Sequence, residues 1–279
     1  MGNILKTFAL LGMLGVILIV LGGLIGGRAG IITAFIFSLL MNGGMYFFSD
    51  KLALSMSGAK PMDKKEHPDI YTMVDELAQK IKIPMPALYI TPEVQANAFA
   101  TGRGPGHASV AVTQGILQAL SPDELRAVLA HELAHVKNRD ILIATIAAVF
   151  ASAISFLSNM ALFGGFSHSD NEDNQGAGAL GLVAAILVPI AASLVQMAIS
   201  REREFGADAT GARTIGSGEP LAKALVAIHR SAQTAPMAAN PATASLYIGD
   251  PMGGLGGRLM ELFSTHPPVE ERIKRLKTI

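Results

Sequence analysis

The stretch Ser121–Asp140, SPDELRAVLAHELAHVKNRD, is the part of the sequence around which the rest of the chain is organised. Ser121 is a favourable N-cap, Pro122 suits the first helical position and Glu124 completes a capping box, so a helix is predicted to begin here. Apolar side chains recur at helical spacing and predict one packed face, formed by Leu125, Leu129, Leu133 and Val136.

Within this helix, HELAH at residues 131–135 matches the pattern H-E-x-x-H. His131 and His135 are four residues apart, so their imidazoles rise from one helical face and can reach a single metal ion. Glu132 lies about 100° further round the helix, close enough to contact a water molecule at that metal. The pattern indicates two zinc ligands and the general base of peptide-bond hydrolysis. A chance match on a surface helix is the alternative, and a third ligand would distinguish the two.

The composition excludes some classes of protein and of metal site. The chain has 279 residues with 22 basic and 22 acidic side chains, and zero net charge gives no support for nucleic-acid binding. Only 16% of the residues are charged, whereas about 25% are charged in an ordinary soluble domain. There is no cysteine, so disulfides and thiolate zinc sites are excluded. A metal must therefore be held by histidine and carboxylate.

Four long runs account for the excess of apolar residues. Ile4–Gly27 contains one charge, Lys6, whereas Ile31–Phe48, Ile141–Phe166 and Gly176–Ser200 contain none. Each run approaches or exceeds the roughly 20 residues that cross a bilayer as a helix, so four transmembrane helices in two hairpins are predicted. A cleaved signal peptide is an alternative for the first run, and buried helices of a soluble domain are an alternative for the second pair.

The charges that flank the runs predict their orientation. The loop His168–Gln175 between the third and fourth runs is acidic, whereas the segment after the first hairpin carries Lys51, Lys60, Lys64 and Lys65. The positive-inside rule then places both termini and HELAH of this multi-pass protein in the cytoplasm, with the acidic loop outside. Arg28 is the exception to this charge pattern.

The predicted organisation has four parts that alternate between membrane and cytoplasm. Residues 1–49 form an N-terminal transmembrane hairpin, and residues 50–140 form the first part of a cytoplasmic catalytic domain with the HELAH helix. Residues 141–200 form a second transmembrane hairpin with the acidic external loop. Residues 201–279 form the second part of the catalytic domain.

A small sheet and another helix are predicted ahead of HELAH. His67–Ile83 has apolar residues at helical spacing, and Ala87–Thr91 has the pattern of a short strand. Asn97–Thr101 and His107–Thr113 are predicted to be two strands joined by a glycine-proline turn. An extended substrate can add itself to an exposed edge of such a sheet, although these strands can equally be core strands.

The segment Ser200–Arg213, SREREFGADATGAR, supplies a candidate third ligand. Glu204 and Asp208 are four residues apart on one predicted helical face. The second hairpin returns the chain to the side on which HELAH lies, so Glu204 is the expected third ligand. Asp208 is placed to accept the outer N–H of a ligand histidine and to fix its orientation. A solvated, charged helix start is the alternative for these acidic residues.

Three motifs in order give the chain its resemblance to a known family. HELAH is followed by a predicted membrane hairpin, by SREREFGADA at residues 200–209 and by STHPPVEERI at residues 264–273. This order resembles the HtpX family of membrane-bound zinc metalloproteases, gluzincins related to the CAAX prenyl endopeptidases. The resemblance covers nearly the whole chain, including ANAFATG at residues 96–102. It implies an α+β, gluzincin-like domain, mostly helical with a small β-sheet, combined with the four transmembrane helices.

The same resemblance implies roles for individual residues. Glu132 is implied to be the base and Asp208 to support a ligand. The ligands of one Zn²⁺ per chain are implied to be His131, His135 and Glu204. The substrate is implied to bind at Asn97, Ala98 and Phe99. The implied activity is that of an endopeptidase at the cytoplasmic face of the inner (cytoplasmic) membrane, acting in the quality control of misfolded or damaged membrane proteins under stress such as heat shock.

Hydrolysis also builds negative charge on the carbonyl oxygen of the substrate, and a hydrogen-bond donor is expected there. His266 is the candidate, because Pro267 and Pro268 limit where its imidazole can point and the resemblance places it beside the metal. Arg201 and Arg203 are rival donors. A capping or packing role in the last helix is the other alternative for His266.

Two further functions compete with the protease. A non-catalytic membrane chaperone or adaptor would keep zinc for structure, but structural sites normally have four protein ligands and three are expected here. This difference favours the enzyme. A CAAX prenyl protease is the third possibility, although four spans are few for the enclosed chamber of that family. The expected partners are protein substrates and the lipid bilayer, without nucleic acid.

Overall fold

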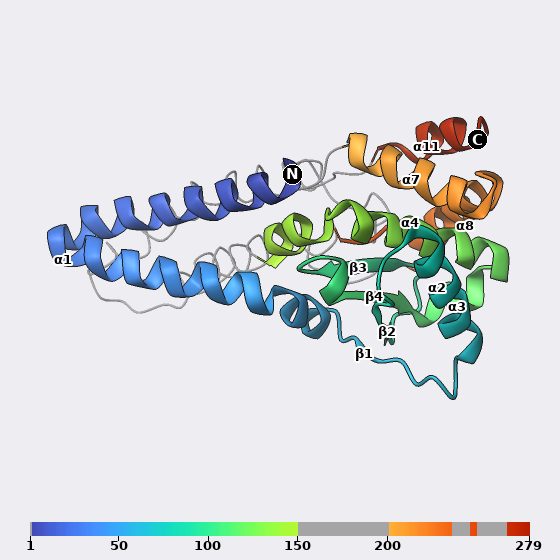
Figure 1. The fold of residues 1–279 in the computed structure, drawn as a ribbon, viewed down its shortest axis with the longest axis horizontal. Helices are drawn as coiled ribbons and strands as arrows, with labels where there is room; N and C mark the ends of the chain where they lie inside the picture. Colours follow the sequence, from blue (N-terminus) through green and yellow to red (C-terminus); the bar gives the residue numbers. More distant parts are fainter. Residues whose placement is uncertain (1, 150–200, 236–245, 250–266) are drawn as a thin grey trace, which may run out of the picture.

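The structure is a computed structural model that describes residues 2–149, 201–235, 246–249 and 267–279, and Figure 1 shows their arrangement. The predicted second hairpin lies outside the described residues except for residues 141–149, which are helical. His266 also lies outside them.

Helix α1, Gly2–Met56, is a helical hairpin. Its chain reverses at Gly27, whose φ of 55° and ψ of −136° fall outside the helical region and suit a residue without a Cβ. The two arms lie side by side in Figure 1, and Asn42 Nδ2 of the second arm donates to the carbonyl of Leu11 in the first, at 3.1 Å. The two apolar runs therefore form a hairpin as predicted, but the second arm continues to Met56, past the predicted boundary at residue 49.

The apolar helices were expected to be long enough to cross a bilayer. Among the described residues, no single helix has the length and apolar composition of a membrane span, whereas Gly27–Gly44 and Tyr46–Met56, which meet at an angle of 63°, have them together. The second arm of α1 exposes many large apolar side chains, among them Phe35, Leu39, Leu40, Phe47 and Phe48.

A four-stranded mixed sheet lies beside the end of α1. Its strands are β1 (Lys60–Pro61), β2 (Ala87–Thr91), β3 (Ala98–Gly102) and β4 (Ala108–Thr113), in the order β1-β2-β4-β3. β2 and β4 are parallel, and the other pairs are antiparallel. The three predicted strands are confirmed. β1 was not predicted because two residues, one of them a proline, carry no alternating pattern. β3 is an edge strand of the sheet, and its side away from β4 is called its outer edge below.

The sheet separates two apolar clusters. Alternate side chains of β3 and β4 point to opposite faces, so Ala98, Ala100, Val110 and Val112 join the larger cluster, while Phe99 joins the smaller one. The larger cluster is covered by α2 (Pro68–Ile81), α4 (Pro122–Asn138) and α8 (Glu219–Thr234). The smaller cluster is closed by the end of α1, by residues 141–149 and by Leu246 and Tyr247.

Helix α4 is the central element of the part of the fold outside the α1 hairpin. It packs against α2, α8, the edge strand β3 and α7 (Arg201–Ile215), and the C-terminal helix α11 (Val269–Leu276) packs against α7 and α8. The helices predicted at residues 67–83, 121–140 and 200–213, and the last helix, are confirmed. The short α3 (Gln114–Ala119) was not predicted. The segments before and after the predicted second hairpin thus pack into one unit.

Candidate metal centre

Helix α4 presents the HELAH residues inside the fold. Its predicted capping box is present: Ser121 Oγ accepts from the Glu124 N–H, and Glu124 Oε2 accepts from the Ser121 N–H. The stripe opposite the histidines is packed as expected. The histidine face is also buried, because α7 lies against it, and His131 and Glu132 are only 1% and 2% exposed. The site is therefore an interface between two helices.

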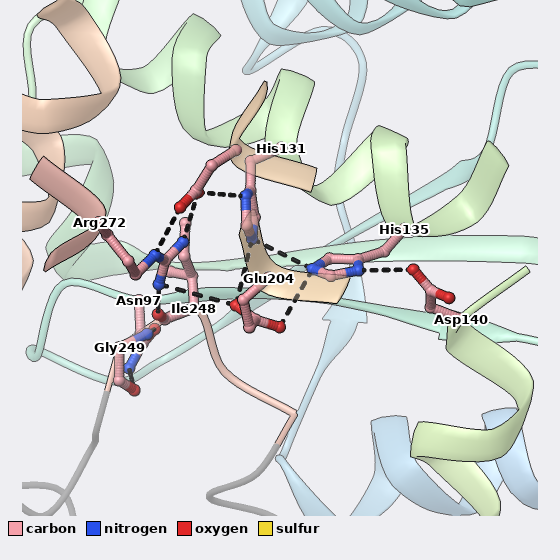
Figure 2. Close-up of polar contacts among 9 residues, drawn as sticks. Asn97, His131, His135, Asp140, Glu204, Ile248, Gly249 and Arg272 are labelled. Atoms are coloured by element: carbon pink, nitrogen blue, oxygen red, sulfur yellow. Dashed lines mark hydrogen bonds and ion pairs between the residues drawn. The ribbon is translucent and has the colours of Figure 1, made fainter. Parts of the chain in front are cut away.

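Three candidate ligands meet at this interface, as Figure 2 shows. The Nε2 atoms of His131 and His135 are 3.2 Å apart. Glu204 on α7 places Oε2 at 3.8 Å from His131 Nε2 and Oε1 at 3.5 Å from His135 Nε2. Zinc bonds of about 2.0–2.1 Å in a tetrahedron would separate neighbouring ligand atoms by about 3.3–3.4 Å. The spacing and the nitrogen and oxygen donors therefore fit one zinc ion.

Each histidine has a carboxylate at its other ring nitrogen. Asp208 Oδ1 lies 2.9 Å from His131 Nδ1, and Asp140 Oδ2 lies 3.2 Å from His135 Nδ1. Such carboxylates hold the ring so that Nε2 faces the metal. Asp140 reaches back to α4 because Arg139 ends the helix in the left-handed conformation, with φ of 60°. The sequence placed Asp208 in this role but did not single out Asp140.

A buried arginine supports the same arrangement from the C-terminal helix. Arg272 on α11 is 1% exposed and binds Asp208 through two hydrogen bonds, Nε to Oδ2 at 2.9 Å and Nη2 to Oδ1 at 2.7 Å. Its Nη1 lies 3.7 Å from Glu204 Oε2. Arg272 thus connects the third ligand to the carboxylate behind His131. Sequence reasoning missed it, because no local pattern distinguishes Arg272 from the other charged residues of this short helix.

Burial and neighbouring charges shift the pKa values of the two histidines and of Asp208 in different directions. Burial lowers the pKa of His131 despite its contact with Asp208. Burial also opposes a charge on His135, but Asp140, Glu204 and Glu132 outweigh it and raise the pKa to about 9. Burial opposes ionisation of Asp208, yet Arg272 and His131 bring its pKa to about 2. Asp208 is therefore a carboxylate whenever the protein is folded near neutral pH.

Glu132 has the environment of a general base. Burial raises its pKa to about 7, and Glu204 acts in the same direction, while His135, Arg272 and the Ala100 N–H oppose the rise. A carboxylate whose pKa lies near the working pH can both accept and return a proton. The hydrogen bond from Ala100 also fixes the carboxylate beside the edge strand β3.

The outer edge of β3 is partly occupied by the segment 246–249. The Ile248 N–H donates to the Ala98 carbonyl at 3.0 Å. Asn97 and Gly249 exchange two hydrogen bonds, from Asn97 Nδ2 at 3.1 Å and from the Gly249 N–H at 3.2 Å. Arg272 Nη1 donates to the Ile248 carbonyl at 3.1 Å, as drawn in Figure 2. The segment is held by the same arginine that supports the metal site.

The three residues expected to bind substrate, Asn97, Ala98 and Phe99, face different directions in the structure. Ala98 turns its carbonyl to the outer edge, whereas the Asn97 carbonyl pairs with the Thr113 N–H of β4. The Phe99 side chain is buried on the other face of the sheet, with its ring 5.1 Å from that of Tyr247. The structure thus brings the carbonyl of Ala98 and the side chain of Asn97 to the outer edge of β3, whereas the Phe99 side chain lies on the other face of the sheet.

Arg201 and Arg203, the alternative donors to the oxyanion, are more exposed to solvent than His131 and Glu204. Arg201 is exposed, whereas Arg203 is partly buried, and this burial lowers its pKa while Asp140 and Glu204 raise it. His266 lies outside the described residues.

Comparison with known proteins places the chain among metalloproteases. A model of peptidase family M48 matches residues 64–279. A protein named Protease HtpX homolog from Pelotomaculum thermopropionicum is 47% identical over 280 residues, with 99% of both chains covered. The protein of the same name from Syntrophobacter fumaroxidans is 50% identical over 285 residues, with 100% of both chains covered. The one from Aquifex aeolicus is 51% identical over 268 residues, which cover 93% of this chain and 87% of that protein.

A solved structure also aligns with the chain. The crystal structure of S. mikatae Ste24p superposes with a TM-score of 0.48 at 17% sequence identity, covering 88% of this chain and 57% of that one.

Proposed function

The chain belongs to peptidase family M48 and is a zinc metalloprotease, and from this premise we propose that it cleaves misfolded or damaged membrane proteins at the cytoplasmic face of the inner membrane. The observation that carries the proposal is the position of Glu132 between three zinc-binding side chains and the edge of β3. The α1 hairpin, with its exposed apolar surface, supports the membrane location.

The proposed roles follow from the contacts. His131, His135 and Glu204 hold the zinc ion, which when bound lowers the pKa of a water molecule and polarises the scissile carbonyl. Asp208 and Asp140 keep each imidazole oriented by accepting from its Nδ1. Glu132 accepts the proton of the attacking water and delivers it to the leaving amine. Three protein ligands leave one position for chemistry, which distinguishes this site from a structural one.

The substrate is proposed to lie along β3 as an added strand, within the segment Asn97–Phe99. Main-chain groups at a sheet edge bind any extended peptide, which suits a protease that acts on unfolded chains. Since Ile248 already donates to the Ala98 carbonyl, the substrate strand must take its place there. His266 is proposed as the donor to the developing oxyanion, with Arg203 as the alternative.

The domain arrangement is part of the proposal. Residues 50–140 and 201–279 form the catalytic unit in the cytoplasm, and residues 1–49 and 141–200 form the two transmembrane hairpins. The positive charges after residue 50 and the acidic loop at residues 168–175 support this orientation. Packing of α4 against α7 supports a single catalytic unit formed by the two cytoplasmic segments.

The test compares the native chain with Glu132→Gln after reconstitution in liposomes with a destabilised membrane protein. We expect the native chain to cleave this substrate in a chelator-sensitive reaction. The variant should retain one zinc per chain and lose at least about 10²-fold in rate, because it keeps every ligand but lacks the base. Zinc loss in the variant would show that Glu132 is misassigned. Equal protection of the substrate by both chains without cleavage would support a chaperone instead.

A further inference from the structure

A cavity of about 610 Å³ lies away from the metal centre, between the end of α1 and the turn that joins β3 to β4. Helix α1 contributes Phe47, Phe48 and Lys51 to its wall, and the turn contributes Arg103 and His107. The metal ligands do not line it. Proteolysis, as proposed above, assigns no role to this cavity.

The two cations in the wall rest on aromatic rings and have no acidic partner. Arg103 Cζ lies 5.2 Å from the centre of the Phe47 ring, and Lys51 Nζ lies 5.9 Å from that of Phe48. Neither side chain forms an ion pair with any described residue. Asp50 also lines the cavity, but its Oδ1 accepts the backbone N–H of Lys51 at 2.8 Å. The wall therefore offers cationic donors to an anion.

One donor in this wall is both buried and unused. Nε of Arg103 is shielded from solvent and has no hydrogen-bond partner among the residues that the structure describes. Leaving a buried donor unpaired costs free energy, so an acceptor from outside the chain would stabilise this arrangement. Arginine commonly binds phosphate oxygens through adjacent N–H groups, and lysine adds a point charge.

The position of the cavity along α1 indicates where such an acceptor comes from. Ile31–Phe48 is uncharged, and Phe47 and Phe48 at its end are 54% and 59% exposed. Lys51 follows one turn later, where the sequence becomes polar. In a chain anchored by this hairpin, the cavity opens where the apolar part of the bilayer ends. Aromatic walls suit the glycerol and upper acyl groups of a lipid, and the cations suit its phosphate.

We propose that this cavity binds the headgroup phosphate of an anionic phospholipid, with Arg103 and Lys51 as its donors. The proposal rests on the proposed membrane location but not on proteolysis. Because Arg103 lies in the turn that continues β3, a bound lipid would hold the edge strand of the sheet at the membrane surface.

The experiment titrates the full-length, zinc-loaded chain in detergent with three probes by calorimetry. The probes are dioctanoyl phosphatidylglycerol, dioctanoyl phosphatidylcholine and inorganic phosphate. We expect saturable binding of phosphatidylglycerol, at least ten-fold tighter than binding of the other two. The double variant Arg103→Gln/Lys51→Gln should weaken it at least ten-fold, and exposed Lys51→Gln alone should act in the same direction. The charge-matched control Lys80→Gln/Lys277→Gln should bind like the native chain.

Several outcomes would overturn the proposal. Equal binding of phosphatidylcholine would show that charge is not recognised, and equal binding of inorganic phosphate would show a site for the free anion. Unchanged binding by the double variant would show that the lipid does not bind in this cavity. An equal loss in the Lys80→Gln/Lys277→Gln control would show the same. No substrate is present in the titration, so absence of proteolysis in a separate assay would leave this result standing.

Discussion

Two carboxylates perform the same local task at this centre in different surroundings. Asp140 contacts His135 next to the end of α4, whereas Asp208 contacts His131 and is also bound by the buried Arg272. Loss of either carboxylate should therefore loosen a ligand. Loss of Asp208 should in addition leave a buried cation without its partner.

We expect Asp140→Asn and Asp208→Asn each to weaken zinc binding by about 10–100-fold, because an amide orients the imidazole less firmly. Asp208→Asn should also cost about 3–5 kcal/mol in the free energy of unfolding of the zinc-free chain. The double variant Asp208→Asn/Arg272→Met should recover part of this stability but none of the zinc affinity. Competition with a chelator and denaturant unfolding measure the two quantities. Native zinc affinity in both single variants would contradict the orienting role.

Among the site residues, those with a fixed spacing along a helix were predictable from the sequence. HELAH and the pair Glu204 and Asp208 repeat at one helical turn, so their common faces follow from helix geometry alone. Asp140 depends on the reversal of the chain at Arg139, whose left-handed conformation is rare for a residue other than glycine. Arg272 depends on a contact across 64 residues of sequence, which no local pattern encodes.

At the scale of elements, the distance between α4 and α7 decides whether the ligands meet. Gly211 on α7 faces the α4 backbone, where an added Cβ would lie 3.0 Å from the nitrogen of His131 and 3.2 Å from the carbonyl carbon of Ala130. Both atoms belong to helical main chain and cannot move aside as a flexible side chain can. Gly206 lies on the same helix with nothing within 4 Å of its added Cβ.

We expect Gly211→Ala to push α7 away from His131, lowering the free energy of unfolding by about 1–3 kcal/mol and weakening zinc binding. The matched control Gly206→Ala should stabilise the chain by up to about 1 kcal/mol, because alanine favours a helix more than glycine does. Denaturant unfolding and zinc titration of both variants measure these effects. Stabilisation by Gly211→Ala would show that the helices have room to adjust.

The segment 246–249 gives a second prediction for an element. Ile248→Pro removes the N–H that occupies the Ala98 carbonyl, so a substrate strand should meet less competition at the edge of β3. We expect a lower KM for casein in a steady-state assay, at unchanged zinc content. Ile248→Val keeps the N–H and should behave like the native chain. A higher KM in the proline variant would show that the segment forms part of the substrate site.

The capping box, the helices α2 and α4 and the three longer strands were predictable because local signals determine them. The short β1 was not predictable, because its pairing with β2 depends on the tertiary position of Lys60 and Pro61 and not on their propensity. The burial of both faces of α4 was also missed. A helix with a polar ligand face resembles a surface helix until a second helix is known to cover it.

At the scale of the whole molecule, composition alone distinguishes the hairpin from the catalytic unit. The proposed topology places Ser57 and Ser169 on opposite sides of the membrane. The chain has no cysteine, so Ser57→Cys and Ser169→Cys each introduce a single thiol. In intact cells we expect an impermeant thiol reagent to label only Ser169→Cys, whereas permeabilised cells should show labelling of both. Equal labelling of the two variants in intact cells would contradict the two-hairpin arrangement.

The order of the site residues along the chain has a consequence for biosynthesis. The histidines on α4 are translated first, Glu204 follows after the predicted second hairpin, and Arg272 on α11 follows later still. A nascent chain on the ribosome therefore carries two ligands without the third, and then three ligands without the arginine that holds Asp208. Until α11 has been translated there is no Arg272 to bind Asp208, so the buried ion pair behind His131 forms only after all three ligands have been made.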